Sequence, residues 1–452
     1  MARRLFGTDG IRGVAGQFPL DPKTVHAVGM ALGTSLLRSH PQAQVVIGMD
    51  TRESGPWIAA ELAGGLARRG VAAEFSGVTT TPGVAFLAKT GPFAAGAMIS
   101  ASHNPYEDNG IKLIGHSGYK LPDEQEESLE TEIFSLLDRG VEPGPAALQV
   151  NQGLDRSYVD HLAATLPLGL GGMRMVVDCA NGSVSSLGPE LFKRLGAEVT
   201  TIHGCPDGRN INLDCGSLHL ETLRAAVLEH AADVGVAFDG DADRALFIAS
   251  SGKLIDGDAV LLLAARHLKQ EGRLTAKDDA PVVVATVMSN LGLERALRLN
   301  GIEMIRTPVG DKYVLEEMLR RGANLGGEQS GHVIFREYAT TGDGLLTALR
   351  VFEVMRQNGA GLDELTAELE VYPQVLVNVR VRERKPLEQL SSVKDEIQAA
   401  EAAFGESGRV LVRFSGTEPL ARVMVEGPDL ARVESHANRI AAEIRNELGS
   451  AD

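Results

Sequence analysis

Cysteine is scarce in this sequence, and its residues form no C-x-x-C pair. The three are Cys179, Cys205 and Cys215. Such sparse usage is typical of a reducing compartment and argues against both a disulfide framework and a thiolate zinc site. We therefore expect a cytoplasmic protein.

Basic residues are also few relative to acidic ones. The chain has 60 acidic and 44 basic residues, which give a formal net charge of −16. Phosphate backbones and anionic lipids would be repelled, so we expect no nucleic-acid partner and no membrane partner. An anionic substrate would need a locally positive pocket. The first residues, "MARRLFGTDG", reach Thr8 and Asp9 before any apolar run forms, which predicts neither a secretory signal nor a membrane span.

Aromatic residues make up only 4% of the chain, whereas glycine supplies 51 of its 452 residues. Short apolar runs rich in Val and Ile each end on small or acidic residues, and helix-like sequence follows them. This pattern predicts βα units. Continuous apolarity is expected of strands covered on both faces, as in mostly parallel sheets, where ligands bind beyond the carboxyl ends of the strands. The predicted strands occupy residues 45–50, 96–102, 173–182, 234–241 and 281–290.

The C-terminal part has a different pattern. Residues 375–385 and 408–427 alternate between apolar and polar, as half-exposed strands do, and residues 434–448 repeat at helical spacing. We expect a small α+β domain here. Clusters of Pro, Gly and polar residues near 140–153 and 370–374 predict two domain boundaries, and a third is placed near 253–257.

The stretch "FDGDADRALF" sets Asp239, Asp241 and Asp243 at every second position between two apolar runs. Three carboxylates at this spacing can converge on one hard cation, because Mg²⁺ and Ca²⁺ prefer oxygen ligands. A solvated acidic turn is the alternative, which the flanking apolar runs disfavour. A calcium EF-hand loop is excluded, since it needs Gly where Arg244 stands and Glu where Ser250 stands.

Two further motifs offer polar groups on glycine-containing loops. The first, "VRFSGTEPLARV", suits a phosphate, although an ordinary hairpin with surface arginines fits it about as well. The second, "LGGEQSGHVIF", suits sugar hydroxyls, although a loop with a satisfied histidine is the simpler interpretation. Neither a P-loop nor a G-x-G-x-x-G nucleotide motif occurs in the sequence. The residues that these two motifs contribute are Arg413, Ser415, Gly416, Thr417 and Arg422, and Glu328, Ser330 and His332.

The stretch "AMISASHNPYEDNGIKLI" places Ser100, Ser102 and His103 where a buried strand is predicted to end. A serine hydrolase is disfavoured, because adjacent residues on an extended segment point to opposite sides and no G-x-S-x-G elbow surrounds them. A capped turn is the structural alternative. A serine, a carboxylate cluster and an arginine-rich anion loop together favour phosphoryl transfer.

The motifs "SASHNP", "DGDADR", "GEQSGH" and "RFSGTEP" occur in the order and at the separations found in the α-D-phosphohexomutases, which the chain resembles over almost its full length. Within that family, "FGTDGIRG" and "GGEQSGH" are most similar to the bacterial phosphoglucosamine mutases. The resemblance implies an α/β fold of four domains around a central cleft, three of them related mixed α/β domains and the fourth a small α+β domain. The implied domains are residues 1–153, 154–255, 256–370 and 371–452, which carry in turn the phosphoserine, metal-binding, sugar-recognition and phosphate-binding loops.

The resemblance also implies roles for the motif residues. Ser102 would be phosphorylated, and Asp239, Asp241 and Asp243 would hold one Mg²⁺ per chain together with an oxygen of that phosphoserine. Catalytic roles beside the phosphoryl group fall to Arg12, Lys112, Arg244 and His332. Sugar and distal phosphate contacts fall to Glu328, Ser330, Arg413, Ser415, Gly416, Thr417 and Arg422.

The implied activity is the interconversion of glucosamine 6-phosphate and glucosamine 1-phosphate through glucosamine 1,6-bisphosphate, which feeds amino sugar and cell-wall precursor synthesis. The partner is then a phosphosugar substrate, and a homodimer is an assembly that the resemblance allows. Two alternatives stay open, a phosphoglucomutase/phosphomannomutase and a non-catalytic phosphosugar-binding protein. Residues 307–314, "TPVGDKYV", add to the substrate site or form a structural turn.

Overall fold

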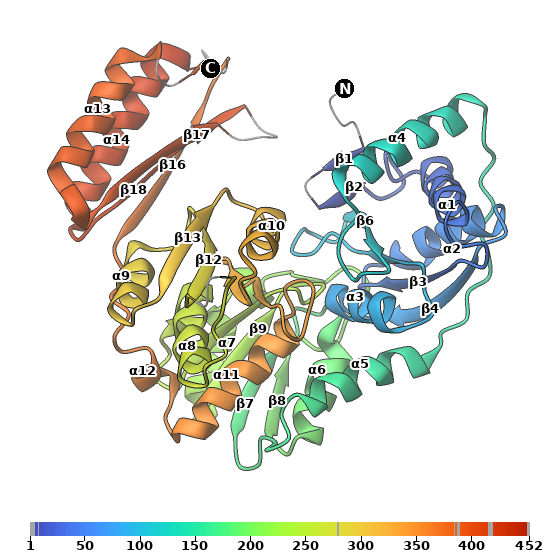
Figure 1. The fold of residues 1–452 in the computed structure, drawn as a ribbon, viewed down its shortest axis with the longest axis horizontal. Helices are drawn as coiled ribbons and strands as arrows, with labels where there is room; N and C mark the ends of the chain where they lie inside the picture. Colours follow the sequence, from blue (N-terminus) through green and yellow to red (C-terminus); the bar gives the residue numbers. More distant parts are fainter. Residues whose placement is uncertain are drawn as a thin grey trace. The chain divides into compact units, whose positions relative to one another are not determined.

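The computed structural model describes residues 5–7, 9–277, 280–383, 385–386, 389–414 and 419–449. The chain forms two compact units. The first comprises Met1–Met288 and Gly301–Ala367, and the second comprises Ser289–Asn300 and Glu368–Asp452. Three β-sheets lie in the first unit and one in the second (Figure 1). Among the described residues, no helix has the length and apolar character needed to cross a bilayer.

The first sheet is mixed, in the strand order β1-β2-β6-β5-β3-β4. Strand β3 pairs in parallel with β4 and β5, whereas β6 and β2 run antiparallel to their neighbours. Val45 and Ile47 of β3 pack in the core that contains α1, α2 and α4, and Val46 packs in the core that contains α3. The sheet is therefore covered on both faces, which explains its continuous apolar runs. Its elements are β1 Phe6–Gly7, β2 Gly10–Val14, α1 Pro22–Leu37, β3 Gln44–Met49, α2 Gly55–Ala67, β4 Ala72–Val78, α3 Thr81–Thr90, β5 Ala95–Ile99, β6 Asp108–Gly115 and α4 Asp123–Asp138.

The second sheet has the order β11-β10-β9-β7-β8. Strands β7, β8 and β9 are parallel, whereas β9 and β10 form an antiparallel pair whose connecting loop carries the aspartates. Phe192 of α6 stacks on Phe238 at the end of β9. The elements are α5 Gln152–Ala164, β7 Arg174–Asp178, α6 Val184–Arg194, β8 Glu198–Ile202, the 3-10 turn η1 Gly216–Leu218, α7 Glu221–Glu229, β9 Val234–Phe238, β10 Ala245–Ala249 and β11 Leu254–Ile255.

The third sheet has the order β13-β12-β14-β15, with the hairpin β14–β15 at one edge. Val314 and Met318 of α10 pack on Val282 and Val284 of β12. Phe352 of α11 makes edge contacts with the rings of Phe192 on α6 and Phe247 on β10. The second and third sheets of the first unit are therefore packed together through these rings. The elements are α8 Gly257–Gln270, β12 Val282–Thr286, α9 Leu291–Leu299, β13 Glu303–Thr307, α10 Asp311–Arg321, β14 Leu325–Gly327, β15 Val333–Phe335, α11 Gly344–Asn358 and α12 Leu362–Leu365, of which α9 belongs to the second unit.

The second unit contains an antiparallel sheet of order β16-β18-β17 with the helices α13 and α14 on one face (Figure 1). Ile440 and Ile444 of α14 lie in its apolar core with Val423 and Val425 of β18. In β18, Ala421, Val423 and Val425 occupy every second position and lie in this core, which explains the alternating pattern of the sequence. The elements are β16 Gln374–Arg380, α13 Ser391–Phe404, the 3-10 turn η3 Gly405–Ser407, β17 Arg409–Phe414, β18 Leu420–Glu426 and α14 Leu430–Leu448.

The predicted strands exist, but several end earlier than the sequence pattern suggests. Strand β5 stops at Ile99 and β9 at Phe238, so Ser100 and the aspartates lie on loops instead of inside strands. Within residues 408–427, β17 Arg409–Phe414 and β18 Leu420–Glu426 form an antiparallel pair, as the alternating pattern predicts. The expectation of mostly parallel sheets was wrong in detail, because hairpins add antiparallel strands to all three sheets of the first unit.

Candidate active site

Ser102 lies on the loop that follows β5. Its backbone φ of +53° is a left-handed conformation that side-chain-bearing residues rarely adopt, and the residue is only 2% exposed. Such strain costs on the order of 1 kcal/mol or more and persists only where surrounding contacts enforce it. Its Oγ donates a hydrogen bond of 2.5 Å to Oδ2 of Asp239. The loop thus presents this hydroxyl to the aspartates of the second sheet.

The two serines of the motif have different environments. Ser100 Oγ donates to Oδ2 of Asp50 at 2.6 Å and accepts the backbone N–H of Ser102 at 2.9 Å. Both roles are structural, because they hold the loop in its strained conformation. Of the two hydroxyls, that of Ser102 is therefore the one at the aspartate cluster.

Arg52 and Asn212 hold the Ser102 loop through its carbonyl oxygens, and neither residue was predicted from the sequence. The buried Arg52 donates from Nη2 to the carbonyl oxygens of Ser102 and Asn104 at 3.0 and 2.9 Å, and it also bonds to the carbonyl of Pro105. Asn212 Nδ2 donates to the same Ser102 and Asn104 carbonyls at 2.9 and 3.1 Å. The signal available for Arg52 was its place in "MDTRES", where a charged pair follows a buried strand.

His103 lies beside the hydroxyl, with Nδ1 3.3 Å from Ser102 Oγ. Burial, together with the positive charges of Arg244 and Arg12, lowers the pKa of His103 to about 4. The imidazole is therefore neutral at neutral pH.

The three predicted aspartates converge on one point. One carboxylate oxygen from each of Asp239, Asp241 and Asp243 lies within 4.8 Å of the others, and all three residues are buried. The left-handed φ of +55° at Ala242 turns the loop tightly enough to bring them together. Burial and repulsion from Asp243 and Asp241 raise the pKa of Asp239 well above its usual value.

This cluster fits a hard divalent cation. Oδ1 of Asp241 and Oδ1 of Asp243 are buried and make no hydrogen bond. Buried carboxylate oxygens that make no hydrogen bond are costly, and an oxygen-preferring cation at their centre would remove both this cost and the mutual repulsion.

Lys112 lies between the aspartate cluster and Asp9. Its Nζ is 2.7 Å from Asp241 Oδ2, 3.0 Å from Asp9 Oδ2 and 3.8 Å from Asp243 Oδ2. Burial opposes the charged form, but Asp241 and Asp9 outweigh it and raise the pKa of Lys112. Lys112 is consequently an ammonium group throughout the neutral range. Thr81 completes this side by donating from Oγ1 to Asp241 at 2.5 Å.

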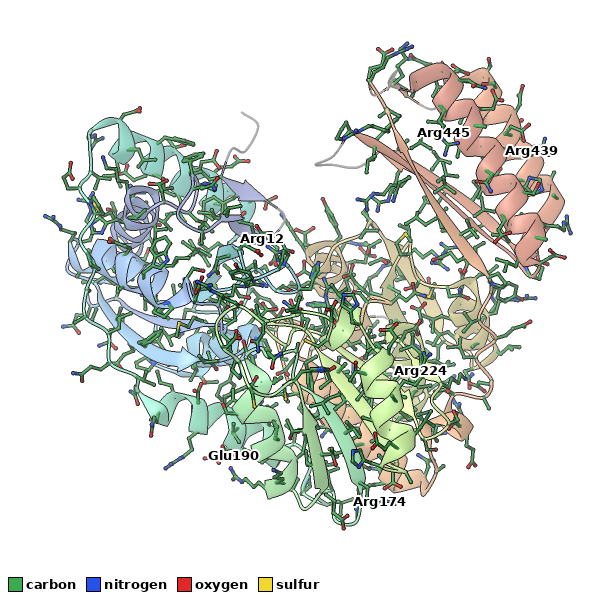
Figure 2. The ribbon with its side chains drawn as sticks, turned by 180° about the vertical axis from the view of Figure 1, so that it is seen from behind. Arg12, Arg174, Glu190, Arg224, Arg439 and Arg445 are labelled. Atoms are coloured by element: carbon green, nitrogen blue, oxygen red, sulfur yellow. The ribbon has the colours of Figure 1, made fainter. Side chains whose placement is uncertain are left out.

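Arg12 and Arg244 bring further positive charge to the same region. Arg12, labelled in Figure 2, bonds to Asp9 and donates from Nη1 to the Ala101 carbonyl at 3.5 Å. Arg244 donates its backbone N–H to Asp239 Oδ1 at 3.2 Å, and its Nε lies 3.7 Å from Asp243 Oδ1. Arg12 therefore flanks the loop that carries Ser102, and Arg244 lies on the loop that carries the aspartates.

The hairpin β14–β15 carries Glu328, Ser330 and His332. Glu328 Oε1 accepts the backbone N–H of Gly310 at 3.0 Å, which fixes its carboxylate. Ser330 is exposed, whereas His332 is buried and accepts the N–H of Gly342 on Nε2 at 3.2 Å. Gly331 at the tip has a φ of +94°, a conformation that favours glycine.

Asp311 and Lys120 connect this hairpin to Asp9, which also pairs with Lys112. Lys120 Nζ lies 2.5 Å from Asp311 Oδ2 and also pairs with Asp9, and His332 Nε2 lies 4.0 Å from Asp311. Asp311 comes from the stretch "TPVGDKYV", so this stretch contributes to the charged network. Lys120 gave no signal in the sequence, because its partners are distant along the chain.

In the second unit, Arg413 of β17 and Arg422 of β18 are directly opposite each other across the hairpin. Burial and the neighbouring Arg422 charge lower the pKa of Arg413. Two positive charges directly opposite each other on neighbouring strands repel. An anion bound between the two guanidinium groups would offset this repulsion, so the pair suits a phosphate. The remaining predicted residues of this loop, Ser415, Gly416 and Thr417, lie outside the described residues.

Comparison with known families gives matches along nearly the whole chain. Models of the phosphoglucomutase/phosphomannomutase domains match residues 3–139 as alpha/beta/alpha domain I and 156–252 as alpha/beta/alpha domain II. Residues 256–372 match alpha/beta/alpha domain III and residues 376–443 match the C-terminal domain. The predicted four-domain α/β architecture is confirmed, while the individual boundaries stay predictions.

Curated relatives agree with these matches. The phosphoglucosamine mutase of Solibacter usitatus (strain Ellin6076) is 61% identical over 449 residues, which cover 99% of this chain and 100% of the relative. The phosphoglucosamine mutase of Koribacter versatilis (strain Ellin345) is 50% identical over 456 residues, covering 99% and 98%.

A solved structure has the same fold. A phosphoglucomutase/phosphomannomutase family protein from Burkholderia thailandensis superposes with a TM-score of 0.81 at 25% identity, covering 99% of both chains. The resemblance to the α-D-phosphohexomutases, and most of all to phosphoglucosamine mutases, is confirmed by these matches. The chain belongs to the phosphoglucomutase/phosphomannomutase family.

Proposed function

We propose that this protein interconverts glucosamine 6-phosphate and glucosamine 1-phosphate by way of a phosphorylated Ser102. The observation that carries the proposal is the 2.5 Å hydrogen bond between Ser102 Oγ and a buried cluster of three carboxylates. The substrate class rests on the relatives named phosphoglucosamine mutase, which match the chain along its full length at up to 61% identity.

In the proposed reaction, the free hydroxyl of the sugar phosphate attacks the phosphorus carried by Ser102. The bond between phosphorus and Ser102 Oγ breaks, a bond to the sugar oxygen forms, and the hydroxyl proton passes in net terms to Ser102 Oγ. The product of this step is glucosamine 1,6-bisphosphate. After the bisphosphate turns round, Ser102 Oγ takes back the other phosphoryl group, and the isomeric monophosphate leaves.

Asp239, Asp241 and Asp243 would hold one Mg²⁺ per chain, together with an oxygen of the phosphoserine. When bound, the ion supplies positive charge that offsets the negative charge on the transferring phosphoryl group. The Oδ1 atoms of Asp241 and Asp243, which are buried and make no hydrogen bond, support this assignment.

Lys112, Arg12 and Arg244 would stabilise charge around the transferring group. Lys112 is an ammonium group whose raised pKa keeps it charged, so we assign it electrostatic stabilisation instead of proton transfer. Arg244 shares its loop with all three aspartates, and Arg12 contacts the carbonyl that precedes Ser102. Together they would give this acidic protein the local positive charge that a phosphosugar needs.

Glu328 and Ser330 would bind the sugar hydroxyls, with His332 beside them. The Gly310 N–H holds one oxygen of Glu328 in place, so the carboxylate is preorganised and supplies a counter-charge for a sugar ammonium group. Arg413 and Arg422, with the loop of Ser415, Gly416 and Thr417, would bind the phosphate that is not reacting. One such site suffices for both half-reactions if the bisphosphate turns round between them.

The proposal is tested by comparing kcat/KM for glucosamine 6-phosphate with kcat/KM for glucose 6-phosphate and mannose 6-phosphate, on Ser102-phosphorylated protein with Mg²⁺. We expect a preference of about 10-fold or more for the amino sugar, equal to about 1.4 kcal/mol in transition-state binding. A preference for glucose or mannose phosphate would instead make the protein a phosphoglucomutase/phosphomannomutase with the same mechanism. Binding without any phosphoryl exchange would identify a phosphosugar-binding protein.

The proposal also covers the cellular location, the domain boundaries and the oligomeric state of the protein. Its three free cysteines fit a reducing compartment, which supports a cytoplasmic location. The domain boundaries at residues 153, 255 and 370 stay predictions, and limited proteolysis tests them. The homodimer also stays a prediction, and light scattering tests it.

A further inference from the structure

A second group of metal-binding side chains lies outside the candidate active site. Asp178 is the last residue of β7, His203 follows β8, and Cys215 precedes η1. One donor atom from each lies within 4.8 Å of the others. We refer to these three residues as the Asp-His-Cys cluster. Arg174, at the opposite end of β7, is labelled in Figure 2 and marks the strand that leads to the cluster.

The spacing of these donors is close to that of a tetrahedral metal site. His203 Nδ1 lies 3.0 Å from Asp178 Oδ2. Zinc–ligand bonds of about 2.0 to 2.3 Å in a tetrahedron place the ligand atoms about 3.3 to 3.8 Å apart. Small side-chain rotations therefore bring the nitrogen, sulfur and oxygen atoms into a common coordination sphere.

The surroundings hold the carboxylate and the thiol in position. Asp178 Oδ1 accepts the N–H of Ala180 at 2.9 Å, and its Oδ2 accepts the N–H of Gly216 at 3.1 Å. The side chain of Asn181 lies 3.9 Å from Cys215 Sγ. Hydrogen bonds of this kind orient metal ligands in known sites.

One side of the cluster is exposed to solvent. Asp178 and Cys215 are buried, but the His203 side chain is 25% exposed, so solvent reaches one side. Water can therefore complete the coordination.

We propose that Asp178, His203 and Cys215 form a binding site for a Zn²⁺-type transition-metal ion, separate from the all-oxygen aspartate site. A mixed set of imidazole, thiolate and carboxylate donors selects zinc over Mg²⁺ and Ca²⁺, which prefer oxygen ligands alone. An Asp178–His203 ion pair is the alternative interpretation, but the convergence of the Cys215 thiol on the same two donors favours a metal site.

The bound ion would stabilise the loop between β8 and η1. This loop lacks regular secondary structure, yet Asn212 within it bonds to the carbonyls of Ser102 and Asn104. Asn212 also donates its backbone N–H to Ala180 at 2.9 Å. An ion joining the ends of β7 and β8 to Cys215 would therefore stabilise the support of the Ser102 loop without contacting the reacting groups.

Cobalt is a suitable probe, because Co²⁺ bound by a thiolate gives a near-ultraviolet charge-transfer band that a site of carboxylates alone cannot give. Reduced full-length protein is first saturated with Mg²⁺ and then titrated with Co²⁺. We expect this band to saturate at one Co²⁺ per chain and to disappear when one equivalent of Zn²⁺ is added. The D241N variant should keep the band, because it alters only the aspartate site.

The variants C215S and H203Q should lose the band or bind Co²⁺ at least about tenfold more weakly. Should C215S fail to fold, H203Q still tests the site, because its side chain is partly exposed. H219Q is the matched control, since His219 is an exposed histidine only four residues after Cys215 and should leave the titration unchanged. A wild-type protein without the band, or equal bands in wild type, C215S and H203Q, would overturn the proposal. The readout is spectroscopic, so neither result depends on mutase activity.

Discussion

Ser102 Oγ donates a hydrogen bond of 2.5 Å to Oδ2 of Asp239, although 137 residues separate the two along the chain. The contact joins the loop after β5 of the first sheet to the hairpin loop after β9 of the second. Both loops contain a non-glycine residue in the left-handed region, Ser102 in one and Ala242 in the other. Backbone strain in both loops, at the point where they meet, is consistent with a functional origin.

Ser102→Ala should abolish steady mutase turnover, because no other described hydroxyl on this loop contacts the aspartate cluster. The expected loss in kcat is on the order of 10³-fold or more, as for other covalent nucleophiles. A coupled assay with glucosamine 1,6-bisphosphate present measures it. Ser100→Ala serves as the comparison and should retain phosphoryl exchange at a reduced rate, since Ser100 positions the loop but does not contact the aspartate cluster. A near-normal rate in Ser102→Ala would contradict the covalent mechanism.

Asp241→Asn should raise the Mg²⁺ concentration needed for half-maximal activity by about tenfold or more, because it removes one of three clustered carboxylates. It also weakens the 2.7 Å ion pair with Lys112, so some loss of stability is expected. Activity titrated against Mg²⁺ and thermal unfolding measure the two effects. Asp233→Asn, at a solvent-exposed pair with Arg174, is the control that should change neither. Full activity after chelation would refute the metal assignment.

Arg52→Lys should destabilise the protein by about 2 to 4 kcal/mol and lower kcat more than it alters KM. Lysine keeps the charge but cannot make the several divergent hydrogen bonds that Arg52 gives to loop carbonyls and to Asp50. Denaturant unfolding gives the stability, and steady-state kinetics separate kcat from KM. Arg209→Lys is a matched control, since its partner Glu53 is half exposed and the pair contributes little. Equal effects of the two substitutions would rule out a positioning role for Arg52.

Asp343→Asn should alter the pH dependence of stability. Burial raises the pKa of Asp343 from 3.8 to about 6, while its oxygens cap α11 and accept the hydroxyl of Tyr158. A raised carboxyl pKa means that the folded state binds the proton more tightly than the unfolded state does. The wild type should therefore lose up to about 3 kcal/mol relative to the variant as the pH rises from about 4 to about 6, and no more above that.

The measurement for Asp343 is the difference in unfolding free energy between wild type and Asp343→Asn at several pH values. Asp160→Asn, at an exposed pair with Arg194, is the control for an Asp-to-Asn substitution on the surface. A constant difference for Asp343→Asn would show that Asp343 has an ordinary pKa.

Local sequence patterns predicted the elements because hydrophobic periodicity and turn residues act over a few neighbours. The runs around β5, β9 and β12 were identified as strands, and the alternating C-terminal runs were identified as strands of a separate α+β domain. Their ends were less predictable. Ile99 and Ser100 are both compatible with a strand, and the strand stops only because the loop must place Ser102 against another domain.

The sequence by itself determined the kinds of chemical groups, their order, and the family to which they belong. Ser102 and the three aspartates could be named from their motifs, because each motif is contiguous. Only the tertiary structure decided which distant groups meet. Arg52, Lys120 and Asn212 have no motif of their own, and their roles come from partners more than 50 residues away or on another sheet.

The cysteines illustrate the same limit. Their spacing argued against a thiolate metal site, yet folding places Cys215 beside Asp178 and His203, from three separate segments of the second sheet. Sequence spacing reports only donors close along the chain, whereas coordination requires donors close in space. The packing of β7, β8 and the loop before η1 fixes that proximity, and so only the folded chain identifies the Asp-His-Cys cluster.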